Sequence, residues 1–243
     1  MKYLKLTNYK NYIFRKHAEY KNLKNNLKTK KLLKVKLPNI QSVDELVDFH
    51  FGTFSEYDHI NKEMFTLILN HFSGSSLNIL ETGSAAHGTK SSLLFASYIK
   101  IYGGKFDTVD TNPKIKESYG YLESKYINFH TNDSLDFIKN LDSRTIENLD
   151  LIYLDSYDLD LENPVGSQEH GLNEFLLLNK KIKKGAIISI DDTPNSFDKF
   201  SYIGKNKFDY IPGKGRLVLE YLDQNPGLFM ILYHDYSLVL KKL

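Results

Sequence analysis

The stretch that decides the fold is Ile79-Leu-Glu-Thr-Gly-Ser-Ala-Ala-His-Gly-Thr-Lys-Ser91. An apolar run ends here in Glu81, a loop of small residues with Gly83 and Gly88 follows, and a second apolar run, 91–101, has the character of a helix. The order strand, loop, helix is the first unit of a doubly wound α/β domain, in which small ligands bind at the carboxyl ends of the strands. The glycines let the backbone approach a ligand closely, and the helix N-terminus presents free N–H groups. The alternative interpretation is a plain turn between a strand and a helix.

The charge of Glu81 narrows the kind of ligand that this loop would bind. Its carboxylate stands at the end of the expected strand, two residues before the first glycine of the loop. A carboxylate is unfavourable beside a phosphate and favourable beside a cation, because like charges repel at short range. The loop therefore favours a ligand that carries a positive charge.

The length and composition are those of one domain with an appendage. The chain has 243 residues, of which 41% are hydrophobic, enough for a buried core. No apolar stretch approaches the roughly 20 residues needed to span a bilayer, and the N-terminus is too polar for a signal peptide. The absence of cysteine excludes disulfides, thiolate catalysis and zinc sites built from Cys. We therefore expect a cytoplasmic protein without a transmembrane segment.

Positive charge is concentrated at the start of the chain. Residues 1–36 hold 12 Lys and Arg against one acidic residue, whereas the rest holds 20 basic and 29 acidic residues. We expect a basic, helical N-terminal extension over 1–40 and an acidic body over 41–243. Such an arm could bind an anionic partner, for example nucleic acid, anionic lipid or a charged glycan. The alternative is a solvated, Lys-rich helix without a partner.

From residue 73 onwards, strand-like and helix-like segments alternate. A Ser-Gly-Ser-Ser break at 73–76 precedes the first strand. Alternation of this kind predicts a doubly wound α/β domain, with a mostly parallel sheet of seven strands, helices on both faces and an antiparallel pair at the C-terminal end. The strands expected after the first are 106–110, 126–130, 149–155, 185–191, 228–233 and 237–240, and the helices are 91–101, 134–141, 168–182 and 216–222.

Acidic residues mark the ends of the expected strands. Glu81, Asp110, Asp155 and Asp191 each end one strand, and Asp133 follows another closely. The carboxyl ends of parallel strands meet at one edge of the sheet, so these five side chains are expected to face a common site. A solvated acidic edge is the alternative interpretation.

Together, these residues resemble the class I S-adenosylmethionine-dependent methyltransferases, over about residues 42–243. The resemblance implies a Rossmann-like methyltransferase fold with S-adenosylmethionine as cofactor, whose sulfonium is a cation suited to Glu81. In this family the glycine-rich loop after the first strand passes the methionine moiety. The interval from Gly83 to Gly88 is one residue longer than the usual spacing. The residues that the resemblance implies at this part of the cofactor are Glu81, Gly83, Ser84, Gly88 and Ser91.

The acids after the second and third strands extend the resemblance to the rest of the cofactor. Asp110, in Thr108-Val-Asp110, matches the acid that binds the ribose diol in the family. Asp133, in Thr131-Asn-Asp-Ser134, matches the acid that contacts the adenine amine, and Ser134 belongs to the same binding segment. The resemblance therefore implies that ribose lies at the second strand and adenine at the third.

A narrower resemblance is to the metal-dependent O-methyltransferases, closest to those that modify sugars and polysaccharides. These enzymes place one Asp after the fourth strand and an acidic pair after the fifth around a divalent cation, which matches Asp155, Asp191 and Asp192. The resemblance implies a Mg²⁺ or Mn²⁺ site that binds and acidifies an acceptor hydroxyl. The alternative for the Asp191-Asp192 pair is a cap of the turn that follows.

The acceptor and the general base are expected from the segment after the fourth strand. Catechol-type relatives carry a Lys three residues after the first metal-binding Asp, but Asp158 occupies that position here, which favours a sugar or glycan-like hydroxyl over a phenol. The hydroxyl must lose its proton, and His170 is the expected general base, with Asp158 as the alternative. Asp155 would be catalytic through the metal. A surface position for His170 is the other interpretation.

Two other functions stay open at this point. The segment Gly83–Ser91 is one residue away from the P-loop pattern of nucleotide hydrolases. The extra Thr89 would turn Lys90 by about 100° around the helix, and Glu81 would lie beside the phosphates, which both count against a P-loop. A methyltransferase that acts on another small molecule without a metal is the second alternative.

Overall fold

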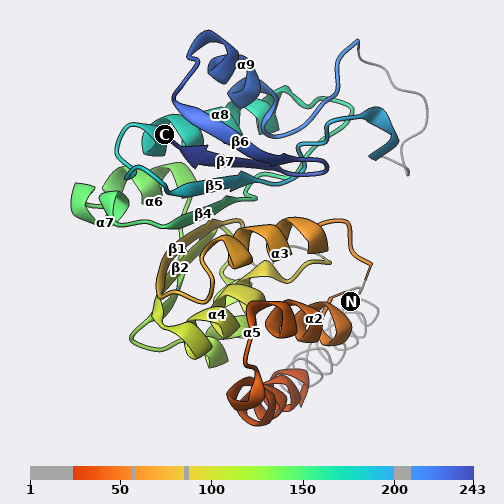
Figure 1. Cartoon of the computed structure of the whole chain (residues 1–243), viewed down its shortest axis with the longest axis vertical. Helices are drawn as coiled ribbons and strands as arrows, with labels where there is room; N and C mark the ends of the chain where they lie inside the picture. Colours follow the sequence, from red (N-terminus) through yellow and green to blue (C-terminus); the bar gives the residue numbers. More distant parts are fainter. Residues whose placement is uncertain (1–23, 56–57, 85–87, 200–208) are drawn as a thin grey trace, which may run out of the picture.

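A seven-stranded sheet with helices on both faces forms the body of the molecule (Figure 1). The computed structural model describes residues 24–55, 58–84, 88–199 and 209–243, and within them the strand order is β3-β2-β1-β4-β5-β7-β6. Strands β1 to β5 pair in parallel, and β7 runs antiparallel to β5 and β6. The predicted doubly wound α/β fold with an antiparallel C-terminal pair is confirmed.

The strands lie close to their predicted positions. Two small differences concern Asp155 and Asp191, which were expected as the last residues of their strands and instead follow β4 and β5 directly. Their amides still continue the ladder, because Asp155 N donates to Thr82 O at 2.9 Å and Asp191 N donates to Leu154 O at 3.0 Å. The strands are β1 Leu77–Thr82, β2 Gly104–Asp110, β3 Ile127–Thr131, β4 Leu151–Leu154, β5 Ile187–Ile190, β6 Phe229–His234 and β7 Leu238–Lys242.

Several helices begin at local capping signals in the sequence. Ser42 Oγ accepts a hydrogen bond from Glu45 N at 3.1 Å at the start of α2, and Pro164 directly precedes α8, which begins three residues earlier than predicted. The helices are α2 Val43–Thr53, α3 Lys62–His71, α4 Ser91–Tyr102, α5 Lys114–Tyr119, α6 Ser134–Asn140, α7 Ser143–Glu147, α8 Val165–Asn179 and α9 Arg216–Gln224, with 3-10 turns at Leu37–Asn39, Gly120–Leu122 and Phe197–Lys199.

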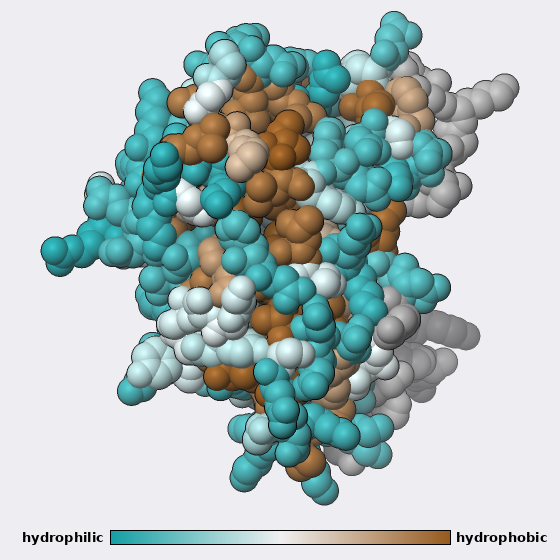
Figure 2. Space-filling model, in the orientation of Figure 1, coloured by the Kyte–Doolittle hydropathy of each residue, from teal (hydrophilic) through white to brown (hydrophobic). Residues whose placement is uncertain are grey.

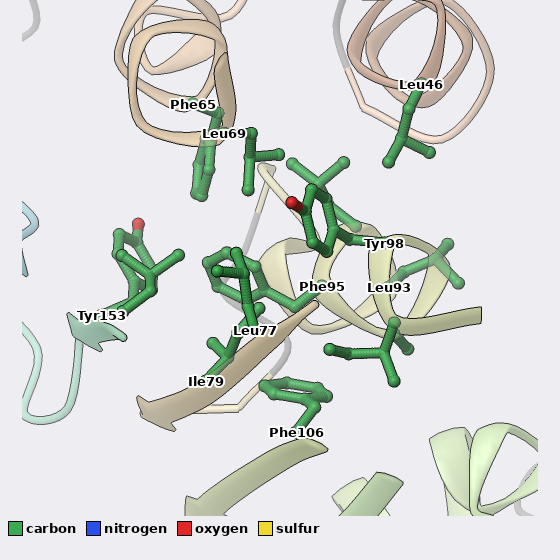
Figure 3. Close-up of a cluster of buried hydrophobic side chains, with 14 of the residues drawn as sticks. Leu46, Phe65, Leu69, Leu77, Ile79, Leu93, Phe95, Tyr98, Phe106 and Tyr153 are labelled. Carbon is green, nitrogen blue, oxygen red and sulfur yellow. The ribbon is translucent and has the colours of Figure 1, made fainter. Parts of the chain in front are cut away.

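Alternating side chains along the central strands build two cores, one on each face of the sheet. Ile79 of β1 belongs to the core formed with α2, α3 and α4, whereas its neighbour Leu80 belongs to the core formed with α6, α8 and α9. In the first core, the rings of Phe65, Phe95 and Tyr153 lie with their centroids 5.3 to 5.8 Å apart (Figure 3). A slip of one residue would exchange the two faces, so these cores fix the register of the strands.

The last part of the basic extension packs on the body. Residues 24–36 form a helix, and Leu33 on that helix is 3% exposed and belongs to the core of α2 to α4. Residues 1–23, which carry the aromatic side chains of the arm, lie outside the described residues. The division of the chain at residue 40 and an anionic partner for the arm stay predictions.

The surface is hydrophilic over most of the face shown in Figure 2, with a band of apolar residues along its middle. Strand β6, at one edge of the sheet, carries exposed apolar side chains, with Met230 44% and Ile231 50% exposed. Edge strands of this kind are places where a sheet can pair with another chain. Among the described residues, no helix is both long enough and apolar enough to cross a membrane.

Candidate active site

A cavity of about 750 Å³ lies at the carboxyl ends of the five parallel strands. Pockets for small ligands commonly have volumes of about 300–1,000 Å³. Of the predicted site residues, Glu81, Gly88 and Ser91 do not line this cavity. Those that do are Gly83, Ser84, Asp110, Asp133, Ser134, Asp155, Asp158, His170, Asp191 and Asp192. The fold therefore brings most of the predicted residues to one place.

Glu81 is fully buried and does not line the cavity. Its Oε2 accepts hydrogen bonds from Thr108 Oγ1 at 2.6 Å and from Ser92 Oγ. Burial raises the pKa of Glu81 to about 7, although these hydroxyl groups stabilise the ionised form. Thr108 Oγ1 also lies 2.6 Å from Ser84 Oγ on the cavity wall. These contacts tie β1 to α4 and β2, and they give no support to a direct contact between Glu81 and a ligand.

The two glycines of the loop have different surroundings. Gly83 has a φ of +80°, and a Cβ at this position would lie 2.2 Å from Asp155 O, so only glycine fits between β1 and the segment after β4. Gly88, with a φ of +86°, lies beside the ring of His59. Ser91, the first residue of α4, is fully buried. Close packing against Asp155 therefore requires glycine at position 83, in addition to any need for close approach to a ligand.

Asp110 is the last residue of β2 and Asp133 follows the neighbouring strand β3, and both line the cavity wall. Asp110 Oδ1 accepts a hydrogen bond from Asn112 N at 2.7 Å, and Asp133 Oδ1 accepts one from Asp136 N at 3.0 Å as the N-cap of α6. Each bond uses one carboxylate oxygen and orients the group, because the partner is a rigid backbone amide. Two oriented carboxylates thus stand where the resemblance implies ribose and adenine.

His170, on α8, lies on the same side of the cavity as the start of α6. Its Nε2 is 2.9 Å from Ser134 Oγ and 3.5 Å from Glu174 Oε1, and its ring packs on Tyr157 with centroids 5.4 Å apart. The hydrogen bond with buried Glu174 raises the pKa of His170. His170 is therefore grouped with Ser134, a predicted adenine-side residue, and its role as general base stays a prediction. Asp158, the alternative base, is an exposed residue of the cavity wall.

A lysine lies among the three aspartates at the ends of β4 and β5. Lys214 Nζ is 2.6 Å from Asp155 Oδ1 and 3.1 Å from Asp192 Oδ2, and the lysine side chain is 4% exposed. Burial alone would lower the pKa of Lys214, but the attraction of Asp155 and Asp192 outweighs it and raises the pKa. The lysine is therefore a buried, charged ammonium group held between two carboxylates.

Two further carboxylate oxygens of this cluster, Asp191 Oδ1 and Asp192 Oδ1, accept hydrogen bonds from neutral donors. Asp191 Oδ1 accepts hydrogen bonds from Asn61 Nδ2 at 2.8 Å and from Ser237 Oγ at 2.7 Å. Asp192 Oδ1 accepts one from the Tyr236 hydroxyl at 2.6 Å. Burial and the nearby charge of Asp192 raise the pKa of Asp191. The cluster is thus a hydrogen-bonded network with the lysine at its centre.

This arrangement does not fit the divalent cation expected from the sequence. In the described parts of the chain, no group of three or more His, Asp or Glu side chains is arranged to hold a metal ion. The place between Asp155 and Asp192 is taken by the ammonium of Lys214, and Asp191 turns one oxygen towards Asn61. The predicted carboxylates do converge, but their charged partner is a lysine.

Several residues of the site have no signal in the sequence that could have identified them: Asn61, His59 and Tyr236 line the cavity far from any motif. Lys214 is different, because it stands between two glycines. A Cβ on Gly213 would lie 2.8 Å from Asp192 O, and one on Gly215 would lie 2.8 Å from the Thr193 side chain. The Gly-Lys-Gly segment can therefore pass tightly against the residues after β5, and this pattern was the one available signal.

Comparison with known proteins identifies the fold. No model of a protein family matches the sequence, and no curated protein matches it. Among solved structures, the MycE methyltransferase from the mycinamycin biosynthetic pathway, in complex with Mg, SAH and mycinamycin VI, matches with a TM-score of 0.58 at 15% identity, over 82% of this chain and 52% of that one. The chain thus spans about half the length of MycE.

Two other solved structures match along nearly their whole length. A putative caffeoyl-CoA O-methyltransferase from Staphylococcus aureus has a TM-score of 0.52 and 17% identity, over 89% of this chain and 99% of that one. An O-methyltransferase from Bacillus cereus in complex with SAH has a TM-score of 0.50 and 18% identity, over 82% and 90%. The chain therefore has the Rossmann-like methyltransferase fold that its sequence predicts.

Proposed function

We propose that the protein is an S-adenosylmethionine-dependent O-methyltransferase. The observation that carries the proposal is the charge of the cavity. Six aspartates line it, and Lys214 is the one Lys or Arg among its described lining residues. Such a cavity attracts a sulfonium cation and repels a polyphosphate, which favours S-adenosylmethionine over the nucleoside triphosphate of a P-loop protein. The methyltransferase fold supports the same assignment.

The residues of β1, β2 and β3 would hold the cofactor. Asp110 would accept hydrogen bonds from the ribose hydroxyls, and Asp133 with Ser134 would hold the adenine. Gly83 lies against Asp155 after β4 and Ser84 contacts Thr108 of β2, and the methionine moiety would pass along this part of the wall. A cofactor held in this order along the sheet would present its methyl group towards the ends of β4 and β5, where the aspartate–lysine cluster lies.

Methyl transfer to a hydroxyl is an in-line displacement. The oxygen lone pair forms a bond to the methyl carbon, the carbon–sulfur bond breaks with its electron pair on sulfur, and the hydroxyl proton passes to a base. Holding the oxygen about 3–3.5 Å from the methyl carbon supplies much of the rate acceleration. His170 is the base predicted from the sequence, and the carboxylates of Asp155, Asp191 and Asp192 line the same cavity.

The acceptor that we propose is a hydroxyl of a sugar or glycan-like small molecule. The cavity wall beyond the cofactor residues is polar, with Asn61, Asp192, Lys214 and Tyr236 as its hydrogen-bonding groups. A polyol can add several hydrogen bonds to such groups, whereas a simple phenol offers them a single hydroxyl. The MycE structure contains mycinamycin VI together with Mg and SAH, which supports a small-molecule acceptor for this fold.

Calorimetry with S-adenosylhomocysteine and ATP tests the proposal. We expect the purified protein to bind S-adenosylhomocysteine at one site with a dissociation constant of about 1 μM–1 mM, the range in which enzyme KM values commonly lie. ATP at the same concentrations should give no heat of binding, because its phosphates would face the aspartates. Binding of ATP without binding of S-adenosylhomocysteine would favour the nucleotide hydrolase.

The variant His170→Gln distinguishes a role of His170 in binding the cofactor from a role as the general base. We expect cofactor affinity to fall about fivefold to tenfold, because one hydrogen bond of about 1 kcal/mol on the adenine side is lost. We expect turnover at saturating cofactor to change less than tenfold. A general base contributes about 10²–10⁴-fold, so a turnover loss of that size with unchanged affinity would establish His170 as the base instead.

A further inference from the structure

The cation that balances the carboxylates at the ends of β4 and β5 belongs to the chain itself. Lys214 Nζ contacts Asp155 Oδ1 at 2.6 Å, Asp192 Oδ2 at 3.1 Å and the backbone carbonyl of Asp155 at 3.4 Å. Three carboxylates that converge without a cation would repel each other strongly. One positive charge at this distance relieves that repulsion, which is the role that a metal ion plays in other carboxylate sites.

The backbone around Lys214 is shaped to hold the side chain in this place. Lys214 N donates to Asp192 O at 2.9 Å. On the opposite side, a Cβ on Gly171 of α8 would lie 2.6 Å from Lys214 O, and the flanking Gly213 and Gly215 are equally close to the residues after β5. Three glycines thus allow the segment to pass between α8 and the end of β5. The close packing of the backbone at residues 213–215 therefore determines where the Lys214 side chain lies.

We propose that the ammonium of Lys214 takes the place of the divalent cation of metal-dependent O-methyltransferases, and that this site orients its acceptor hydroxyl without a metal ion. The inference rests on the proposed function. An ammonium has three N–H donors and carries a fixed positive charge. Two donors are used by Asp155 and Asp192, and the third, which makes only the long 3.4 Å contact with Asp155 O, can turn to the acceptor oxygen. During transfer the oxygen bonds to the methyl carbon, sulfur keeps the electron pair of the broken bond, and the hydroxyl proton passes to a carboxylate of the cluster.

Binding of Mn²⁺, followed by electron paramagnetic resonance, tests this inference without any need for the acceptor. We expect the wild-type protein to bind no Mn²⁺ at this site up to about 1 mM. Lys214→Ala should create a site for one Mn²⁺ with an affinity at least about 100-fold higher, because the carboxylates then lack a cation. Lys214→Arg, which keeps the charge, should exclude Mn²⁺ like the wild type. Lys183→Met is the matched control, because Lys183 pairs with Asp150 at 2.5 Å at the other end of β4.

The outcomes distinguish this inference from the proposed function. One Mn²⁺ bound tightly by the wild type and lost in Asp155→Asn overturns the inference, and this measurement does not require that a lysine variant folds. Equal Mn²⁺ binding in the wild type and in folded Lys214→Ala, whether tight or absent, overturns it as well. S-adenosylhomocysteine binding is measured on the same samples. If the wild type binds both S-adenosylhomocysteine and Mn²⁺, the inference fails and the proposed function stands. If the wild type does not bind S-adenosylhomocysteine, the result counts against the proposed function.

Discussion

Asp110→Ala should lower the affinity for S-adenosylhomocysteine at least about 100-fold. The carboxylate of Asp110 lies on the cavity wall at the end of β2, and its bond with Asn112 N uses one oxygen only. Two hydrogen bonds from ribose hydroxyls to a charged carboxylate are each worth about 1.5–3 kcal/mol, so their loss exceeds about 3 kcal/mol, or a factor of about 100. Calorimetric titration measures the change directly.

Two further variants make the interpretation of Asp110→Ala specific. Asp110→Asn keeps an oxygen for Asn112 N and loses the charge, so we expect an intermediate loss of about tenfold. Asp136→Ala removes a carboxylate that is 64% exposed and lies outside the cavity, and it should leave the affinity unchanged. If folded Asp110→Ala retains its affinity within a factor of five, ribose is not bound at the end of β2.

The second large effect concerns Glu81 and the dependence of stability on pH. Burial raises the pKa of Glu81 from 4.5 to about 7 in the folded protein. The folded state therefore holds this proton more tightly than the unfolded state. The stabilisation from the protonated carboxyl is complete below pH 4.5 and is lost as the pH rises to about 7. Above pH 7 the buried, ionised carboxylate costs on the order of 3 kcal/mol.

Glu81→Gln should therefore be more stable than the wild type at pH 8.5, on the order of 3 kcal/mol, because the amide cannot ionise. At pH 4.5 the two proteins should differ by less than about 1 kcal/mol, because both side chains are then neutral. Urea denaturation at the two pH values measures the free energy of unfolding. Glu63→Gln on the exposed side of α3 controls for the loss of one charge. A difference between wild type and Glu81→Gln that is the same at both pH values would show that the pKa of Glu81 is not raised in the folded protein.

The sequence alone was sufficient for the order of the strands and for the convergence of the aspartates at their carboxyl ends. Ser42 and Asp133 mark the starts of α2 and α6. Such N-caps are recognisable in a sequence because the capping side chain bonds to an amide only three residues away. The strands are recognisable because a buried strand leaves an apolar run, and parallel pairing then brings Asp110, Asp155 and Asp191 to one edge. These inferences use short stretches of chain and a general rule of α/β sheets.

Only the tertiary structure decided which groups surround those acids. Lys214 lies 59 residues from Asp155, and Asn61 lies 130 residues from Asp191, so neither contact leaves a local pattern in the sequence. Glu81 was correctly placed near the end of β1, but the packing of α4 and β2 directs its carboxylate into the protein. Periodicity is encoded within a few residues, whereas the partner of a buried charge depends on how distant segments pack. For this reason the sequence determined where the carboxylates gather, and the fold determined that a lysine holds two of them.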